Sequence, residues 1–146
     1  MTTSIQNEKK IRHIVYSYAT SLTAPGVVAG VPSSRAQSFS FFDNKLVGYQ
    51  YISNFLADRT DFDEAAVLSF KEGVTTRADV IQKLGEPTGQ SVYPLVDDKA
   101  DRAIGYSYSF VDTRPATIVI ERQSLTIVFG PDEVAKKITY TKSGRT

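Results

Sequence analysis

The stretch GVTTRADVIQKLGEPTG, residues 73–89, encloses a short helical segment between strong signals for its start and its end. The Thr76 hydroxyl can cap the free N–H groups of the first turn, and Asp79 then completes an Asp variant of the capping box. Gly85 can adopt a left-handed conformation after the last turn, and Pro87 prevents the helix from continuing. The sequence therefore predicts a helix that begins after Thr76, or after Thr75 as the alternative cap, and ends at Gly85.

This helix is too short to be stable by itself. It spans about two to three turns, and isolated helices shorter than about 12–15 residues are marginal in water. Its apolar residues form one stripe, made of Val80, Ile81 and Leu84, that needs a sheet to pack on. A second helix is predicted just before it, with Thr60 or Asp61 as its cap and Gly73 as its end.

Alternating apolar residues predict antiparallel strands on both sides of the helix pair. In the first of them, IRHIVYSYATS, the residues Ile14, Tyr16 and Tyr18 share one face, and the sequence Asp43-Asn44-Lys45 is typical of a tight hairpin. The expected strands cover residues 11–21, 38–42, 46–56, 103–110, 117–129 and 134–141, with loops at 22–37 and 90–101 and a frayed N-terminus at 1–10.

Two parts of the chain resemble each other. Tyr16-Ser17-Tyr18 recurs as Tyr106-Ser107-Tyr108, and the hairpin FSFFDNKLVGYQYIS recurs as TIVFGPDEVAKKITY. The order strand, loop, strand, tight turn, strand thus occurs twice, with the helix pair between the copies. A true repeat is favoured over the alternative that any two tyrosine-rich meanders look alike.

These elements predict an α+β fold, in which an antiparallel β-meander carries two short helices packed on one face. An extra half-repeat of three strands, residues 11–56, precedes the complete repeat of two helices and three strands at residues 57–146. With 146 residues, the chain is expected to form one compact unit.

Composition excludes several classes of function. The chain has no Cys, so disulfides, thiolate metal sites and Cys nucleophiles are ruled out. Its formal net charge of +1 does not indicate a nucleic-acid partner. Charged residues make up 23% of the chain and hydrophobic residues 41%. This is the balance of a globular protein.

The chemistry-bearing residues do not form a recognisable catalytic or metal-binding pattern. The single histidine, His13, has no nucleophile elbow to serve, and the cluster Asp97, Asp98 and Asp101 lacks the ligand spacing of a calcium loop. We therefore expect no enzyme activity, no cofactor and no metal ion.

The residues LVGYQYISNF are apolar on both faces of the predicted strand, which indicates either cover on both sides or an exposed contact surface. If Leu46 and Ile52 face the core, Tyr49 and Tyr51 point outward. Tyrosine suits protein interfaces because it is large, rigid and polar at its tip. The predicted protein-binding residues are Tyr49, Tyr51 and Phe55, with Lys45 and Arg59 as the polar rim; packing against the other half, or in a homodimer, is the alternative.

One ordered set of residues resembles a known family. The pattern Phe70-x-x-Gly73-x-Thr75-Thr76-x-x-x-Val80-x-x-x-Leu84-Gly85-x-Pro87, followed by Tyr106-x-Tyr108 and Leu125-x-Ile127-x-Phe129, is similar to the SmpA/OmlA (BamE-like) family of bacterial outer-membrane lipoproteins. The resemblance implies two helices on a three-stranded meander, export, a lipid anchor on an N-terminal Cys, and a role in protein assembly in the periplasm.

The resemblance leads to an expected function and place of work. We expect a non-catalytic protein–protein interaction domain of the bacterial cell envelope, periplasmic and associated with the outer membrane only through an anchor absent from this sequence. The start MTTSIQNEKKIRH lacks the apolar core of a signal peptide, so a cytoplasmic location is the alternative.

Two other functions stay open. One is an inhibitor or immunity-type protein that binds an enzyme through its sheet face, because the tandem pattern also resembles the β-lactamase inhibitor proteins. The other is a small hydrolase-like enzyme that uses carboxylates.

Overall fold

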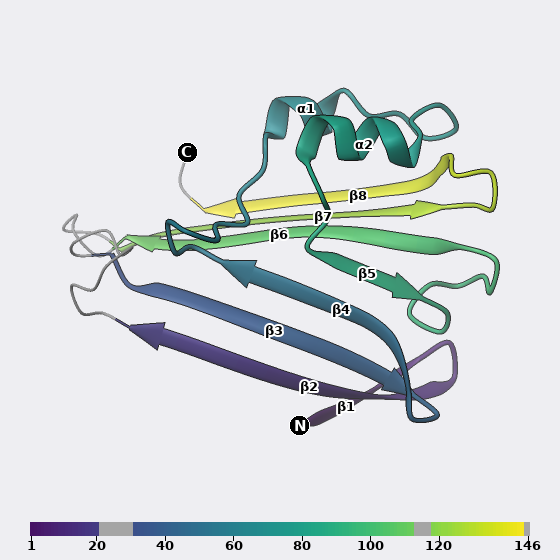
Figure 1. Cartoon of the computed structure of the whole chain (residues 1–146), viewed down its shortest axis with the longest axis horizontal. Coiled ribbons are helices and arrows are strands. Elements are labelled where there is room, and N and C mark those ends of the chain that lie inside the picture. Colours follow the sequence, from purple (N-terminus) through teal and green to yellow (C-terminus); the bar gives the residue numbers. More distant parts are fainter. Residues whose placement is uncertain (21–30, 113–117, 145–146) are drawn as a thin grey trace.

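A computed structural model describes residues 1–20, 31–112 and 118–144. They form one antiparallel sheet of eight strands whose order in space follows their order in the chain, with both helices inserted between the fourth and fifth strands (Figure 1). The strands are β1 (Thr2–Gln6), β2 (Lys9–Thr20), β3 (Ser33–Phe42), β4 (Lys45–Ser53), β5 (Gly89–Val92), β6 (Arg102–Asp112), β7 (Val119–Phe129) and β8 (Ala135–Gly144), and the helices are α1 (Glu64–Leu68) and α2 (Arg77–Leu84).

The predicted α+β fold is wrong. Among the described residues, strands make up 57% and helices 10%, and the strands form one curled antiparallel sheet of eight rather than an ααβββ arrangement. The physical reason is β5, a strand of four residues that pairs with β4 on one side and with β6 on the other. It makes the two meanders, β2–β4 and β6–β8, parts of one continuous sheet.

The N-terminus was predicted to be frayed, and this is also wrong. Thr2–Gln6 pairs along its whole length with β2. The two-residue turn at Asn7 and Glu8 has φ angles of 47° and 62°, which suit a tight hairpin. The Asn7 side chain donates hydrogen bonds to the carbonyl oxygens of Pro94, at 3.0 Å, and Val96, at 3.2 Å. The hairpin is thereby tied to the loop between β5 and β6, across the curl of the sheet.

Other boundaries differ from the predicted ones in a consistent direction. The loop expected at 90–101 begins with β5, and part of the loop expected at 22–37 is the first half of β3, while residues 21–30 lie outside the described residues. The first half of β3 and the whole of β5 are mostly polar and therefore lack the apolar alternation that predicts a strand. The tight turn at Asp43 and Asn44 is confirmed, with φ angles of 51° and 59°.

The helix α2 has the predicted cap. The Thr76 hydroxyl accepts a hydrogen bond from the Asp79 N–H, and the Asp79 carboxylate accepts one from the Thr76 N–H at 2.9 Å. These bonds lower the pKa of Asp79. Gly85 has the predicted positive φ of 81°, but its ψ of −173° extends the chain instead of completing a left-handed turn.

The helix α1 is shorter than predicted and has a different cap. Asp63, and neither Thr60 nor Asp61, accepts the hydrogen bond from the first turn, at 2.9 Å from the Ala65 nitrogen. Thr60 is buried between two strands instead. Its hydroxyl accepts from the Ser53 N–H of β4 at 3.1 Å and donates to the Ser107 carbonyl of β6 at 2.5 Å. Thr60 therefore connects β4 and β6 beyond the end of β5, which pairs only with residues 48–50 and 102–105 of these strands.

The hydrophobic core lies between the helix pair and β6–β8. One face of these strands packs against Val67, Phe70 and Val80 from the helical region. The strand residues in this core are Ile104, Tyr106, Leu125, Ile127, Phe129 and Ala135. The Tyr106 hydroxyl donates a hydrogen bond to the Gly85 carbonyl oxygen at 2.8 Å, so the end of α2 is fastened to the sheet.

The segment between the helices covers the outer edge of β8. The Gly73 N–H donates to the Ala135 carbonyl at 2.7 Å, the Ala135 N–H donates to the Thr75 carbonyl at 2.8 Å, and the Glu72 carboxylate accepts from the Ile138 N–H at 2.9 Å. Backbone groups of an edge strand would otherwise be open to pairing with another chain.

We predict that Thr76→Ala lowers the free energy of unfolding by about 1 kcal/mol, because it removes the cap of a helix that depends on it. Urea unfolding followed by circular dichroism measures the change. Thr141→Ala, at an exposed position on β8, is the control and should change stability by less than about 0.5 kcal/mol. Equal effects of the two substitutions would contradict the role of the cap.

Tyr106 should make the protein less stable at high pH. Burial raises the pKa of Tyr106 from 10.0 to about 12. Because the pKa is raised in the folded state, the stabilising contribution is complete below pH 10 and is lost as the pH rises from 10 to 12. Tyr106→Phe should lose about 1 kcal/mol at pH 7 with its hydrogen bond, and should then lose less than the wild type between pH 10 and 12. Urea unfolding at pH 7, 10 and 11.5 tests this; parallel decline of both proteins would contradict it.

Candidate binding surface

Seven residues of β2, β3 and β4 lie on one side of the sheet, because residues directly opposite each other in paired strands project to the same side. Ile14 lies opposite Phe39, which lies opposite Tyr49, and Tyr16 lies opposite Gln37, which lies opposite Tyr51. We call this set, with Tyr18 at the end of β2, the aromatic face: Ile14, Tyr16, Tyr18, Gln37, Phe39, Tyr49 and Tyr51.

The aromatic face is on the same side of the sheet as the helices. Tyr49 lies opposite Gln90, and Gln90 lies opposite the core residue Ile104. The helices, however, pack on β6–β8, and Figure 1 shows the β2–β4 part of the sheet extending away from them. Tyr16 is consequently 65% exposed, Tyr18 54% and Tyr49 36%, whereas Tyr106 and Tyr108 in β6 are 3% and 5% exposed.

Arginine side chains lie over the rings at both ends of the aromatic face. The Arg35 guanidinium carbon is 5.0 Å from the centre of the Phe55 ring and 5.7 Å from that of Tyr18, and these two rings stack with centres 6.0 Å apart. Arg12 lies over Phe41 at 5.4 Å. The surface therefore combines aromatic contact area with positive charge.

The structure brings three of the five predicted binding residues together and separates the other two. Tyr49 and Tyr51 belong to the aromatic face, and Phe55 adjoins it through Tyr18. Lys45 is exposed at the turn that begins β4, and Arg59 donates a hydrogen bond to the Tyr108 hydroxyl at 3.0 Å in the helix-covered part. These two residues do not form a rim around the tyrosines.

The predicted outward orientation of Tyr49 and Tyr51 depends on the condition that Leu46 and Ile52 face the core. Leu46 does not meet this condition, because it is 50% exposed. The side of β4 that carries Tyr49 and Tyr51 is the side that forms the core in β6–β8. Tyr49 is exposed because α1 and α2 pack on β6–β8 and do not extend over β4.

Tyr51 is held in place by a polar cluster. Its hydroxyl donates to the Asp58 carboxylate, which also accepts from the Ser53 hydroxyl at 2.8 Å and lies 3.5 Å from Arg35. The hydrogen bond from Tyr51 is the main cause that lowers the pKa of Asp58, while burial and the same bond raise the pKa of Tyr51. Tyr51 therefore fixes the chain after β4, and Tyr16, Tyr18 and Tyr49 are the freer contact residues.

Sequence reasoning missed Tyr16, Tyr18, Phe39 and Arg35 as parts of this surface. The alternation in residues 11–21 already placed Tyr16 and Tyr18 on one face of a strand. The missing information was the strand order, which sets β2 and β3 beside β4.

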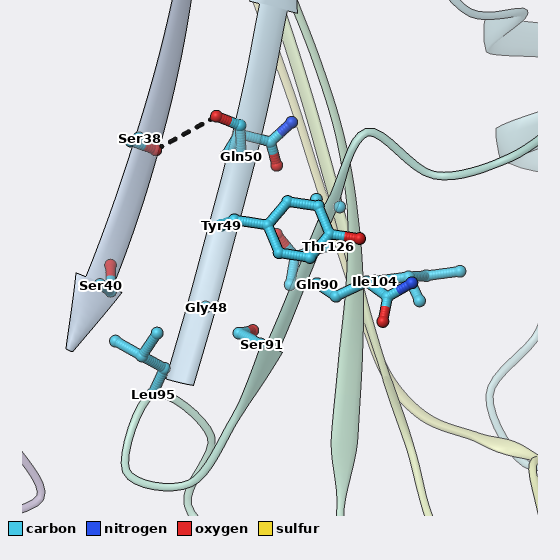
Figure 2. A pocket seen from close by; sticks show the side chains of 12 residues that line it. Ser38, Ser40, Gly48, Tyr49, Gln50, Gln90, Ser91, Leu95, Ile104 and Thr126 are labelled. Atoms are coloured by element: carbon cyan, nitrogen blue, oxygen red, sulfur yellow. Dashed lines mark hydrogen bonds between the residues drawn. The ribbon is translucent and has the colours of Figure 1, made fainter. Parts of the chain in front are cut away.

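A polar hollow lies at the junction of β4, β5 and β6 (Figure 2). Gly89 and Gly105 leave room for the Gln50 amide: a Cβ atom on Gly89 would come within 2.1 Å of the Gln50 Oε1 atom and 2.9 Å of the Tyr49 carbonyl oxygen. The Gln50 amide donates to the Thr88 hydroxyl and to the Tyr51 carbonyl, both at 2.9 Å. The side chain thus binds β4 to the strand junction.

The hollow offers little to a carboxylate mechanism. Its described lining residues bring hydroxyls from Ser38, Ser40, Ser91 and Thr126, and none of them is Asp, Glu or His. General acid–base catalysis needs a group with a pKa near the working pH within reach of a substrate.

His13 lies in a row of hydrogen bonds across β1, β2 and β3. Its Nε2 atom is 2.6 Å from the Ser4 hydroxyl and its Nδ1 atom 2.9 Å from the Ser40 hydroxyl. In a Ser–His pair, the serine hydroxyl is the nucleophile and the imidazole is its base, and a third group, usually a carboxylate, orients the imidazole. Both partners of His13 are hydroxyls, so this row ties strands together.

The acidic cluster Asp97, Asp98 and Asp101 is occupied by structural contacts. Asp97 accepts from Asn7, Asp98 accepts from the Ala100 N–H, and Asp101 pairs with Lys136 at 2.7 Å. Within the part of the chain that the structure describes, no group of three His, Asp or Glu side chains is arranged to hold a metal ion.

The chain matches no model of a protein family, and neither the curated proteins nor the solved structures provide a match. Neither α1 nor α2 has the length and apolar run that a bilayer-crossing helix needs.

We predict that Tyr51→Phe raises the pKa of Asp58 toward its ordinary value, because the largest cause of the lowering is removed. A lowered carboxyl pKa stabilises the fold above about pH 4 and loses that effect as the pH falls through the folded-state pKa. The variant should therefore be less stable than the wild type at pH 6 and should lose less on acidification.

Carbon-13 NMR titration of the Asp58 carboxyl measures the pKa directly. Ser53→Ala removes the second hydroxyl donor and is the matched comparison, with a smaller expected rise. An unchanged pKa in Tyr51→Phe would show that the hydroxyl does not bind Asp58 in solution.

Proposed function

We propose that this chain is a non-catalytic protein-binding domain that recognises its partner through the aromatic face. The observation that carries the proposal is the exposure of Tyr16, Tyr18 and Tyr49 on one side of a continuously paired sheet. Tyrosine and arginine are enriched among the residues that dominate binding energy, and both occur here side by side. A rigid sheet also loses little conformational entropy when a partner binds.

The proposal includes a location in the bacterial cell envelope, on the periplasmic side of the outer membrane. Its support is the resemblance of residues 70–87 and 106–129 to the SmpA/OmlA (BamE-like) pattern. The binding role does not depend on this location, since it follows from the composition of the aromatic face.

The double substitution Tyr16→Ser with Tyr49→Ser should abolish partner binding and leave the folded domain intact. Tyrosines at the centre of an interface each contribute about 2 kcal/mol or more, so the double variant should bind at least several hundred-fold more weakly. Leu68→Ser with Val74→Ser is the matched control, because these two apolar residues are 73% and 69% exposed in the helical region.

Photo-crosslinking in the native cells provides the measurement. Benzoylphenylalanine at position 18 should give a discrete cross-linked protein that disappears in the double tyrosine variant and persists in the control variant. A large fall of the thermal midpoint in the tyrosine variant, or a cross-link from position 68 that equals the one from position 18, would argue against the proposal.

A further inference from the structure

The aromatic face has the same layout as the face that α1 and α2 cover. In β2–β4, one row across the strands is Ile14, Phe39 and Tyr49; in β6–β8, the corresponding row is Ile104, Ile127 and Ile138. The next row is Tyr16, Gln37 and Tyr51 in the first meander, and Tyr106, Leu125 and Tyr140 in the second.

The positions of strand irregularities support the correspondence. The register shifts between Ser40 and Phe41 in β3, and between Val128 and Phe129 in β7, each time close to the tight turn that leads into the next strand. The two meanders therefore present equivalent positions to the same side of the sheet.

In the second meander, these rows are covered by residues of α1, α2 and the segments beside them. Phe62 contacts the rings of Tyr106 and Tyr140, with centres 5.8 and 6.3 Å apart, and Val67, Phe70 and Val80 complete the contact. In the first meander, Tyr16 contacts Phe39 within the sheet, and Tyr18 contacts Arg35 and the Phe55 ring, but Tyr16 stays 65% exposed and Tyr18 54%. The same surface layout is covered in one half and open in the other.

The size of the open surface suits one helix. Three neighbouring strands at about 4.8 Å spacing present a band about 10 Å wide, and an α-helix with its side chains is about 10–12 Å in diameter. An apolar stripe at positions i, i+3, i+4 and i+7 would meet the two rows.

The positive charge around the aromatic face indicates which charge a bound helix should carry beside its apolar stripe. Lys10 and Arg12 lie on the same side of β2 as Tyr16, and Arg35 lies opposite Tyr18. The carboxylate of Asp58 accepts hydrogen bonds from Tyr51 and Ser53 and lies 3.5 Å from Arg35, whose side chain is still 50% exposed. In the second meander, Glu64 of α1 pairs with Lys142 at the end of β8, at 2.6 Å. Carboxylates beside the apolar stripe would complement the open face in the same way.

We propose that the partner of this domain docks an amphipathic α-helix with acidic flanks on the aromatic face, in the manner in which α1 and α2 pack on β6–β8. The proposal rests on the proposed protein-binding function and specifies the element that is bound. Tyr16 and Tyr49 contact the apolar stripe, and Lys10, Arg12 and Arg35 pair with the flanking carboxylates.

The test uses the full chain and three stapled helical peptides of equal length. The first has a Leu/Phe stripe with Glu on its flanks, the second has the same stripe with Lys on its flanks, and the third is the Glu peptide with its apolar residues scrambled around the helix. Titration followed by NMR gives the affinities and the amides that shift. The Glu peptide should perturb Tyr16, Tyr18 and Tyr49 and bind at least tenfold more tightly than the other two.

Charge reversal provides the matched controls. Lys10→Glu with Arg12→Glu should weaken the Glu peptide at least tenfold and strengthen the Lys peptide. Lys137→Glu, an exposed charge on the opposite side of β8, should change neither affinity by more than about twofold. The proposal is overturned if the Glu peptide does not bind, if the scrambled peptide binds equally well, or if the shifts lie outside the aromatic face. It is also overturned if a short single-stranded DNA binds this face more tightly than the Glu peptide does.

The cross-linking experiment separates this failure from failure of the proposed function. If the position-18 cross-link depends on Tyr16 and Tyr49 but maps to an extended segment of the partner, the domain binds protein and the helix proposal is wrong. If the cross-link does not depend on these tyrosines, the protein-binding function itself is wrong.

Discussion

The whole architecture depends on how β4 and β6 are joined. The strand between them, β5, has only four residues. Just before β5, Thr88 alone connects the two strands: the Tyr51 N–H donates to the Thr88 carbonyl at 2.8 Å, and the Thr88 N–H donates to the Gly105 carbonyl at 3.1 Å. The buried Thr60 hydroxyl forms a further bridge between Ser53 and Ser107. Because buried backbone groups need partners, these few contacts determine whether the chain forms one sheet or two separate meanders.

The joint also explains the division of the sheet into a covered and an open half. Residues 54–63 connect β4 to α1 and contact β6 through Thr60 and Arg59. This connection places α1 on β6–β8. With five and eight residues, α1 and α2 are too short to cover more than that part of the sheet. The open half thus keeps a surface laid out like a core face, but it has Phe39, Tyr49 and Gln37 at the positions where the covered half has Ile127, Ile138 and Leu125.

The different residue types at equivalent positions of the two meanders connect the fold to binding. An exposed row of isoleucine and leucine would be an aggregation hazard on a sheet, whereas tyrosine has a polar tip and arginine keeps its charge hydrated while it lies over a ring. The first meander has Gln37 and Arg35 at the positions where the second has Leu125 and Gln123. Its surface can remain exposed to solvent in the free protein and still offer a large contact area.

The sequence by itself determined the elements with strong local signals: the capped helix α2, the tight turn at Asp43 and Asn44, and the alternating strands around Tyr16 and Tyr106. Their causes are hydrogen bonds and φ preferences within a few residues, so a single sequence carries them. Only the tertiary structure decided that β1 and β5 are strands, that Thr60 is a bridge rather than a cap, and which face of β4 the helices leave open. These features depend on hydrogen-bond partners far away in the chain, and polar strands without apolar alternation carry no local signal of those partners.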